Sequence, residues 1–251
     1  CWVFVPLPAA LYLQAEKTTD SLIHTLSQKE KSEILSIPLD YPFMKNEEKL
    51  ALIERFKQHA GVKEILLSDV GYMQGMSGNG LTTEKGNENS WVDISVMAVP
   101  ANFFSFMNIP IEQGRLPQTE KDIVVDNVWQ EMQKKDVIGM NLYSGNTDYT
   151  ICGISAPFQA NVYNRSSGYA FLPYDPSVYI GHCYIKSHPG QQKEVARWIE
   201  KVYREMLPEN ITYQAKTFLD DIHILQALEY NLKDIILFFA VISIIITLLG
   251  V

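Results

Sequence analysis

Residues 33–69 read EILSIPLDYPFMKNEEKLALIERFKQHAGVKEILLSD, a pattern that predicts two strands joined by a helix. The apolar runs 33–39 and 62–69 are typical of strands. Between them, residues 47–60 place apolar side chains on one helical face: Leu50, Ile53, Phe56 and Ala60. Gly61 follows as a helix stop. We therefore interpret the stretch as a β-α-β unit.

The same order recurs near the end of the chain. Residues 179–186 alternate as a strand, and residues 190–207 follow with a helical stripe of Val195, Trp198, Ile199, Val202 and Met206. Pro208 ends that helix, and residues 211–215 supply a further strand. Two β-α-β units separated by about a hundred residues predict one split α+β subdomain with an insertion.

The insertion has shorter elements of its own. We expect strands at 91–99, 123–125, 139–142, 149–154 and 168–172, and helices at 101–107 and 127–135. A turn is expected around Gly114, Arg115 and Pro117, and a long helix from Thr217 toward the chain end. The predicted organisation is 15–99 for the first half of the split subdomain, 100–177 for the inserted small α/β subdomain, and 178–232 for the second half with a stalk.

Both ends of the chain are apolar. Residues 235–251 carry no charge, and residues 1–14 carry none either. A bilayer span needs about 20 apolar residues, so neither run is long enough alone. We interpret 1–14 as the end of a first transmembrane segment and 233–251 as the start of a second transmembrane helix. A signal-peptide remnant or an apolar arm is the alternative for 1–14.

Composition and cysteine content narrow the function. The chain has 29 acidic and 21 basic residues, a net charge of -8, which argues against a nucleic-acid surface. Three cysteines do not form a disulfide framework, although a bridge between Cys152 and Cys183 is left open.

The sequence predicts no catalytic, cofactor-binding or metal-binding residue. The five histidines are scattered through the sequence and are interpreted as surface or half-buried: His24, His59, His182, His188 and His223. The neighbours His182 and Cys183 would point to opposite faces of a strand. The glycines in residues 71–80 lack the lysine and hydroxyl residue of a phosphate loop. The acidic pairs Glu47/Glu48 and Asp220/Asp221 are interpreted as solvated helix faces. We therefore expect no enzyme.

Several segments of the insertion resemble, in order, those of one family. Residues 102–110 (NFFSFMNIP) with 113–115 (QGR) resemble the D-F-F … G-I-P … G-R stretch of MacB/FtsX-type ABC transporter permeases. Further similar segments are 123–127, 137–142, 149–154 and 237–251, the last resembling the start of a membrane span. The chain departs from the family at Asn102, where an acidic residue is usual, at Val128, where Glu or Gln is frequent, and at Met140, where lysine is common.

The resemblance implies a mechanical part of a transporter. Residues from about 15 to 232 would lie on the periplasmic side of a bacterial inner membrane, between two spans, in a split porter-like fold. The implied partners are a cytoplasmic ABC ATPase, a second permease copy or paired permease, and a periplasmic adaptor. The alternative on topology alone is the extracytoplasmic ligand-sensing domain of a receptor kinase.

Overall fold

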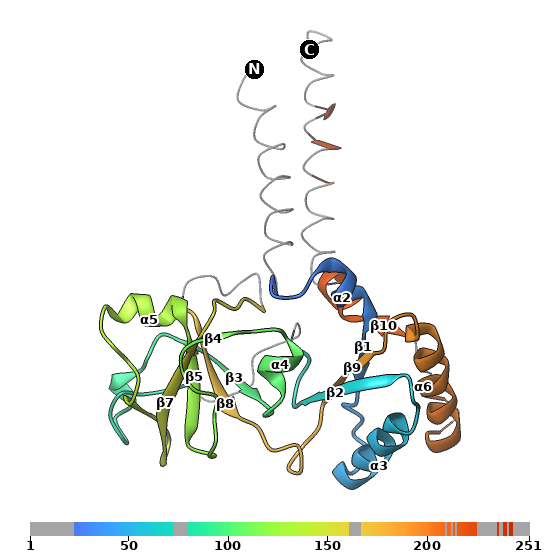
Figure 1. Ribbon diagram of the computed structural model, residues 1–251, viewed down its shortest axis with the longest axis horizontal. Coiled ribbons are helices and arrows are strands. Elements are labelled where there is room, and N and C mark those ends of the chain that lie inside the picture. The colour runs from blue at the N-terminus through green and yellow to red at the C-terminus, as the bar shows by residue number, and fades with distance from the viewer. Residues whose placement is uncertain are drawn as a thin grey trace.

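Two β-sheets lie side by side and share one core, which confirms the predicted mixed α+β class (Figure 1). The structure, a computed structural model, describes residues 23–72, 80–160, 167–208, 210–211, 213, 215–224, 235, 238–239 and 241–242. Within these residues one sheet has four strands and the other has six.

The four-stranded sheet interlocks the two β-α-β units. Its order is β10-β1-β9-β2, with bounds Lys216–Thr217, Ile34–Pro38, His182–Ser187 and Val62–Ser68. β9 runs antiparallel to both β1 and β2, so each unit leaves a gap that a strand of the other unit fills. The connecting helices are α3 (Asn46–Lys57) and α6 (Gln192–Met206). The predicted strand at 211–215 is wrong: its described residues are not in a strand, and pairing with β1 begins at Lys216.

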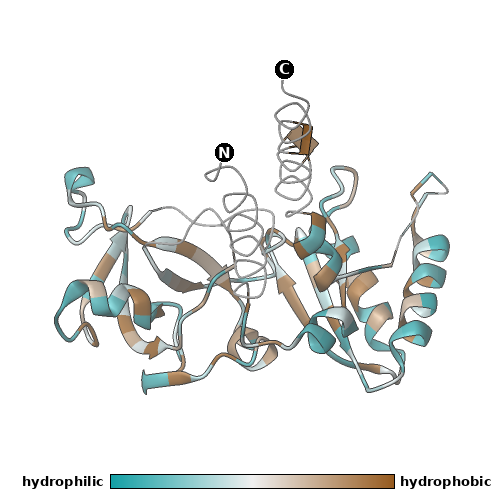
Figure 2. Ribbon diagram, turned by 90° about the horizontal axis from the view of Figure 1, so that it is seen from above, coloured by the Kyte–Doolittle hydropathy of each residue, from teal (hydrophilic) through white to brown (hydrophobic). Residues whose placement is uncertain are grey.

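The two faces of this sheet have different partners because side chains alternate along a strand. On one face, Leu35, Ile37, Cys183 and Ile185 pack with α3 and α6. Figure 2 shows polar residues along the outer sides of the covering helices. The predicted stripe of α6 is only partly correct. Val195, Ile199 and Val202 are buried and Trp198 is half-buried, whereas Met206 is exposed and Tyr203 takes its place.

The six-stranded sheet follows the order β3-β8-β5-β7-β4, and β6 pairs with β7. Its strands are β3 (Ser95–Val99), β4 (Ile111–Gly114), β5 (Asp122–Asp126), β6 (Asn141–Ser144), β7 (Thr147–Ser155) and β8 (Tyr169–Pro173). The expected strands at 91–99 and 139–142 are therefore misplaced at their starts. Gly139 lies in a left-handed turn with φ of 80°, which ends the loop before β6.

Short helices complete the fold, and several of them begin at capping side chains. They are α2 (Gln28–Glu33), the 3-10 helix η1 (Glu88–Ser90), α4 (Phe103–Phe106) and α5 (Asn127–Gln133). Ser27 and Glu30 form a reciprocal capping box at α2, and the Asp126 carboxylate accepts from the Trp129 amide at α5. α2 and β4 were not predicted.

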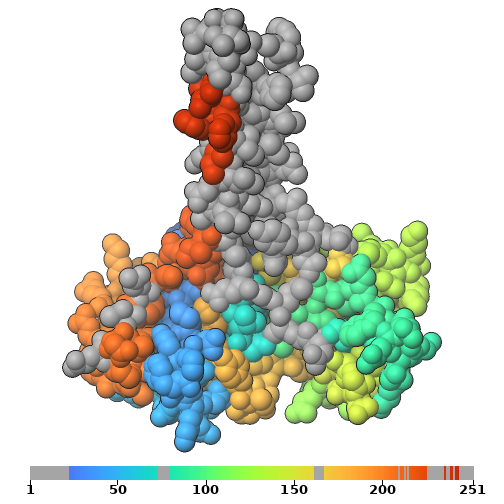
Figure 3. Space-filling view, turned by 180° about the vertical axis from the view of Figure 1, so that it is seen from behind, coloured from blue at the N-terminus to red at the C-terminus, as the bar shows by residue number. Residues whose placement is uncertain are grey.

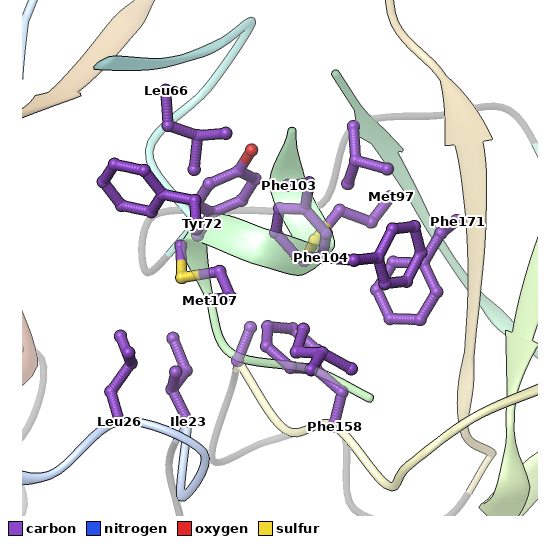
Figure 4. Close-up of a cluster of buried hydrophobic side chains, with 14 of the residues drawn as sticks. Ile23, Leu26, Leu66, Tyr72, Met97, Phe103, Phe104, Met107, Phe158 and Phe171 are labelled. Atoms are coloured by element: carbon purple, nitrogen blue, oxygen red, sulfur yellow. The ribbon is translucent and has the colours of Figure 1, made fainter. Parts of the chain in front are cut away.

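The second face of the four-stranded sheet packs against the six-stranded sheet through a central cluster of apolar side chains (Figure 4). Members labelled there come from both sheets and from the segments between them: Ile23, Leu26, Leu66, Tyr72, Met97, Phe103, Phe104, Met107, Phe158 and Phe171. Aromatic side chains bury large apolar areas, so this shared core resists separation of the sheets.

The first described helix and the last helix of the described body lie side by side (Figure 1). Residues 218–224 are helical and lie beside α2 (Figure 1). No helix among the described residues is long and apolar enough to cross a bilayer. The predicted segment 1–14 and most of 233–251 fall outside the described residues, as does the stretch 225–234 of the long helix predicted from Thr217. Of the described positions there, Ile235, Phe238, Phe239 and Val241 are exposed.

Candidate functional site

Most of the sequence candidates for chemistry lie apart in the fold, but His182 and Asp221 meet at the Ser36 hydroxyl. Within the residues that the structure describes, no group of three or more acidic, histidine or cysteine side chains could hold a metal ion. Cys152 and Cys183 are both free and buried, one in each sheet, so the bridge left open does not form. Gly80 lies against Trp91, where an added Cβ would come within 2.0 Å of the indole.

Two candidates are buried, contrary to the interpretation of His182 as surface or half-buried and of Asp221 as part of a solvated helix face. His182 is only 2% exposed, and its Nε2 lies 2.7 Å from the Ser36 hydroxyl. Asp221 is 9% exposed and accepts a hydrogen bond from the same hydroxyl. Its neighbour Asp220 instead caps the helix 218–224, where its carboxylate accepts from the Thr217 amide at 2.7 Å.

The junction between the two sheets is centred on α4 and the residues that flank it. We call residues 102–109 the α4 segment. The Asn102 amide nitrogen donates to the Ile65 carbonyl at 3.0 Å and to the Glu64 carboxylate at 3.1 Å, both in β2. Lys186 of β9 donates to the Phe106 carbonyl. Because β2 is an edge strand, the Asn102 contact also occupies one of its free carbonyl groups.

The same segment contacts the start of the described chain. Thr25 donates its hydroxyl hydrogen to the Met107 carbonyl at 2.6 Å, and the Asn108 amide donates to the Glu30 carboxylate at 3.0 Å. Asn108 has φ of 53°, a left-handed conformation that asparagine tolerates better than most residues. The α4 segment thus lies in sequence between β3 and β4 of the six-stranded sheet. It contacts the four-stranded sheet through Asn102, and it also contacts the residues with which the described chain begins.

Beneath these polar contacts, the α4 segment inserts aromatic rings into the central cluster. The Phe103 ring lies 5.3 Å from Tyr72 and 5.5 Å from Phe171, and the Phe104 ring lies 5.3 Å from Phe171. These separations are in the range of favourable aromatic pairs. The sequence resemblance covers this segment, and its buried phenylalanines join the two sheets.

The outgoing helix is attached through both a strand and its own buried face. β10 pairs with β1 immediately before the helix begins. Phe218 and Ile222, four positions apart on one helical face, are buried in the central cluster, and the Phe218 ring lies 5.2 Å from Tyr184. Figure 3 shows residues near both described ends packed together on one side of the molecule.

Within the six-stranded sheet, the Gly-Arg pair of the resemblance holds a loop. The Arg115 guanidinium donates to both carboxylate oxygens of Asp122, at 2.7 and 3.0 Å. This contact, with backbone amides of Gln118 and Thr119, keeps the pKa of Asp122 well below its usual range. Gly114 has φ of 74°, as its place in the predicted turn requires, although it ends β4.

The arrangement consists of hydrogen bonds and packed rings that join distant parts of the chain. Its residues are separated by long stretches of sequence. Ser36 and His182 are 146 positions apart, and Ser36 and Asp221 are 185 apart. No local pattern marks such pairs. The capping pairs Ser27/Glu30 and Thr217/Asp220 do carry a recognisable signal in the sequence.

The fold is similar to that of two solved transporter domains. The periplasmic region of MacB from Actinobacillus actinomycetemcomitans has a TM-score of 0.51 at 11% identity, covering 82% of this chain and 98% of that one. A domain of a proposed permease protein from Porphyromonas gingivalis has a TM-score of 0.50 at 14% identity, covering 70% and 85%. No protein-family model and no curated protein matches the sequence. The MacB-like fold expected from the sequence is thus confirmed.

Proposed function

We propose that the chain is the extracytoplasmic domain of an ABC transporter permease, which passes ATP-driven motion from a cytoplasmic ATPase to the outer side of the membrane. The observation that carries the proposal is the entry of both described chain ends into one sheet of a MacB-like fold. α2 leads directly into β1, and β10, which pairs with β1, leads directly into the helix 218–224.

This geometry suits transmission of movement. A displacement of α2 or of the helix 218–224 reaches β1 without crossing a loop, because α2 abuts β1 and the helix follows β10, which pairs with β1. From the four-stranded sheet, the shared aromatic core and the α4 segment carry the displacement to the six-stranded sheet. Close-packed cores transmit strain because they compress little.

The family resemblance of the sequence implies a location, an assembly and a division of the chain, which we include in the proposal. The segments 1–14 and 233–251 would be membrane-embedded. The domain would divide near residues 99 and 177, although the first division separates β3, which ends at Val99, from its pairing partner β8. The protein would reside in a bacterial inner membrane as a homodimer or with a paired permease, and a periplasmic adaptor is a further proposed partner. The domain itself would catalyse no reaction.

The test is to purify the full-length protein from its native host and identify its companions by mass spectrometry. A cytoplasmic ATPase at a one-to-one or simple ratio, with ATP hydrolysis that vanadate inhibits, supports the permease. A kinase module in the same chain that labels itself with phosphate, with no ATPase present, overturns it in favour of a receptor domain.

A further inference from the structure

Three polar side chains meet in the otherwise apolar layer between the four-stranded sheet and the helix 218–224. Ser36 comes from β1, His182 from β9 and Asp221 from the helix, and they are 1%, 2% and 9% exposed. Buried polar groups are costly unless they are hydrogen-bonded, and here the Ser36 hydroxyl satisfies both neighbours.

The single hydrogen of the Ser36 hydroxyl determines which group donates in each hydrogen bond of the network. A hydroxyl has one hydrogen to donate, and that hydrogen points to the Asp221 carboxylate. His182 must therefore donate to Ser36 through Nε2–H, as the neutral Nε2 tautomer. Burial lowers the pKa of His182 to about 4, which agrees with a neutral ring at pH 7.

The trio does not have the geometry of a nucleophilic triad. In a triad the serine directs its hydrogen to the histidine and the carboxylate holds the other ring nitrogen. Here the serine hydrogen is directed to Asp221, and all three groups are buried away from any substrate. The consequence of the network is therefore positional.

The pairing of β10 with β1 fixes where the helix begins, but apolar contacts alone leave it free to turn about its axis. Phe218 and Ile222 hold it against Tyr184 and the central cluster, but the hydrophobic effect has no direction. A hydrogen bond from Ser36 to Asp221 requires one rotation of the helix. We propose that the Ser36–His182–Asp221 network is the joint that sets the rotation of the helix 218–224 on the sheet. Its use in passing on motion rests on the proposed function, whereas the joint itself does not.

The test is hydrogen–deuterium exchange on the purified full-length protein, comparing Ser36→Ala with Ser68→Ala. Ser68 is an internal control because it lies buried in β2 of the same sheet and donates its hydroxyl hydrogen to the Val70 carbonyl at 2.7 Å, far in sequence from the helix. Ser36→Ala should speed exchange of the amides at 221–224 by about tenfold, and Ser68→Ala should leave them unchanged. In both variants exchange in α6 should stay as in the wild type.

Unchanged exchange at 221–224 in Ser36→Ala overturns the joint, and so does an equal rise in α6, which reports general destabilisation. If Ser36→Ala does not fold, Asp221→Asn and Asp221→Leu decide the question. Asn keeps an acceptor for the Ser36 hydroxyl and should retain slow exchange, whereas Leu should lose it; equal exchange in the two variants contradicts the proposal. These outcomes hold whether or not an ATPase accompanies the protein, so the joint and the proposed function can fail separately.

Discussion

Asn102→Asp should loosen the junction between the two sheets. The substitution keeps the shape of the side chain but removes the amide that donates to the Ile65 carbonyl at 3.0 Å and to the Glu64 carboxylate at 3.1 Å. Each lost hydrogen bond costs about 1 kcal/mol. The new carboxylate also faces Glu64, and repulsion between half-exposed like charges adds about 1 kcal/mol. The expected loss of unfolding free energy is about 3 kcal/mol at pH 7.

The assay is thermal and urea unfolding of the purified protein, followed by tryptophan fluorescence. A loss of this size lowers Tm by roughly 6–12 °C for a domain of this length. Asn102→Ala, which removes the hydrogen bonds without adding charge, should lose about 2 kcal/mol. The double variant N102D/E64Q restores an amide opposite a carboxylate and should recover at least half of the loss.

An Asn102→Asp variant no less stable than Asn102→Ala would contradict this expectation, and so would two variants within about 0.5 kcal/mol of the wild type. Added salt should narrow the difference between the two single variants, because the repulsion is screened. The same geometry explains a departure from the resembled family. An acidic residue at position 102 would face Glu64 in this chain, and asparagine avoids that contact.

Gly114→Val should lower the unfolding free energy by about 3 kcal/mol or more, because φ is 74° and the new Cβ would lie 2.3 Å from the Cys152 carbonyl oxygen. A Tm equal to that of the wild type would contradict this. Trp198→Asp should lower the unfolding free energy measured in urea by about 2–4 kcal/mol. The substitution removes the indole donor to the Arg55 carbonyl at 3.1 Å and places a charge in the contact between α3 and α6. Burial lowers the pKa of His182 from 6.5 to about 4, so the unfolded chain takes up the proton first as the pH falls. The unfolding free energy should therefore decrease as the pH drops from 6.5 to 4, by about 2 kcal/mol at pH 5. Asp221, whose pKa burial raises, acts in the opposite direction, and His182→Gln should flatten the decline measured by urea unfolding.

Much of the four-stranded sheet could be predicted because its periodicity is local. β9 alternates between two buried faces, and α6 carries its apolar residues on one helical stripe. Residues 211–215 were misread because an apolar alternation shows that a segment suits a strand, not that a partner is present. Pairing starts at Lys216 because β1 provides its register there.

The junction could be located from the sequence only by resemblance, and its contacts could not be predicted. The buried phenylalanines of α4 suit a core in any fold, and nothing local to Asn102 indicates Ile65 as its partner. Asp220 and Asp221 look alike in sequence, yet one caps a helix and the other is buried against Ser36. Which face of the helix meets the sheet depends on long-range packing, which one sequence does not display.

The most direct measurement is hydrogen–deuterium exchange on the complete permease with its ATPase in lipid, free of nucleotide and then trapped with ATP and vanadate. We expect altered exchange in α2 and in the helix 218–224 on trapping, while the strand β2 beside the α4 segment keeps its protection, because the sheets move together. Identical exchange throughout the domain in both states would contradict the central claim that ATP-driven motion reaches it.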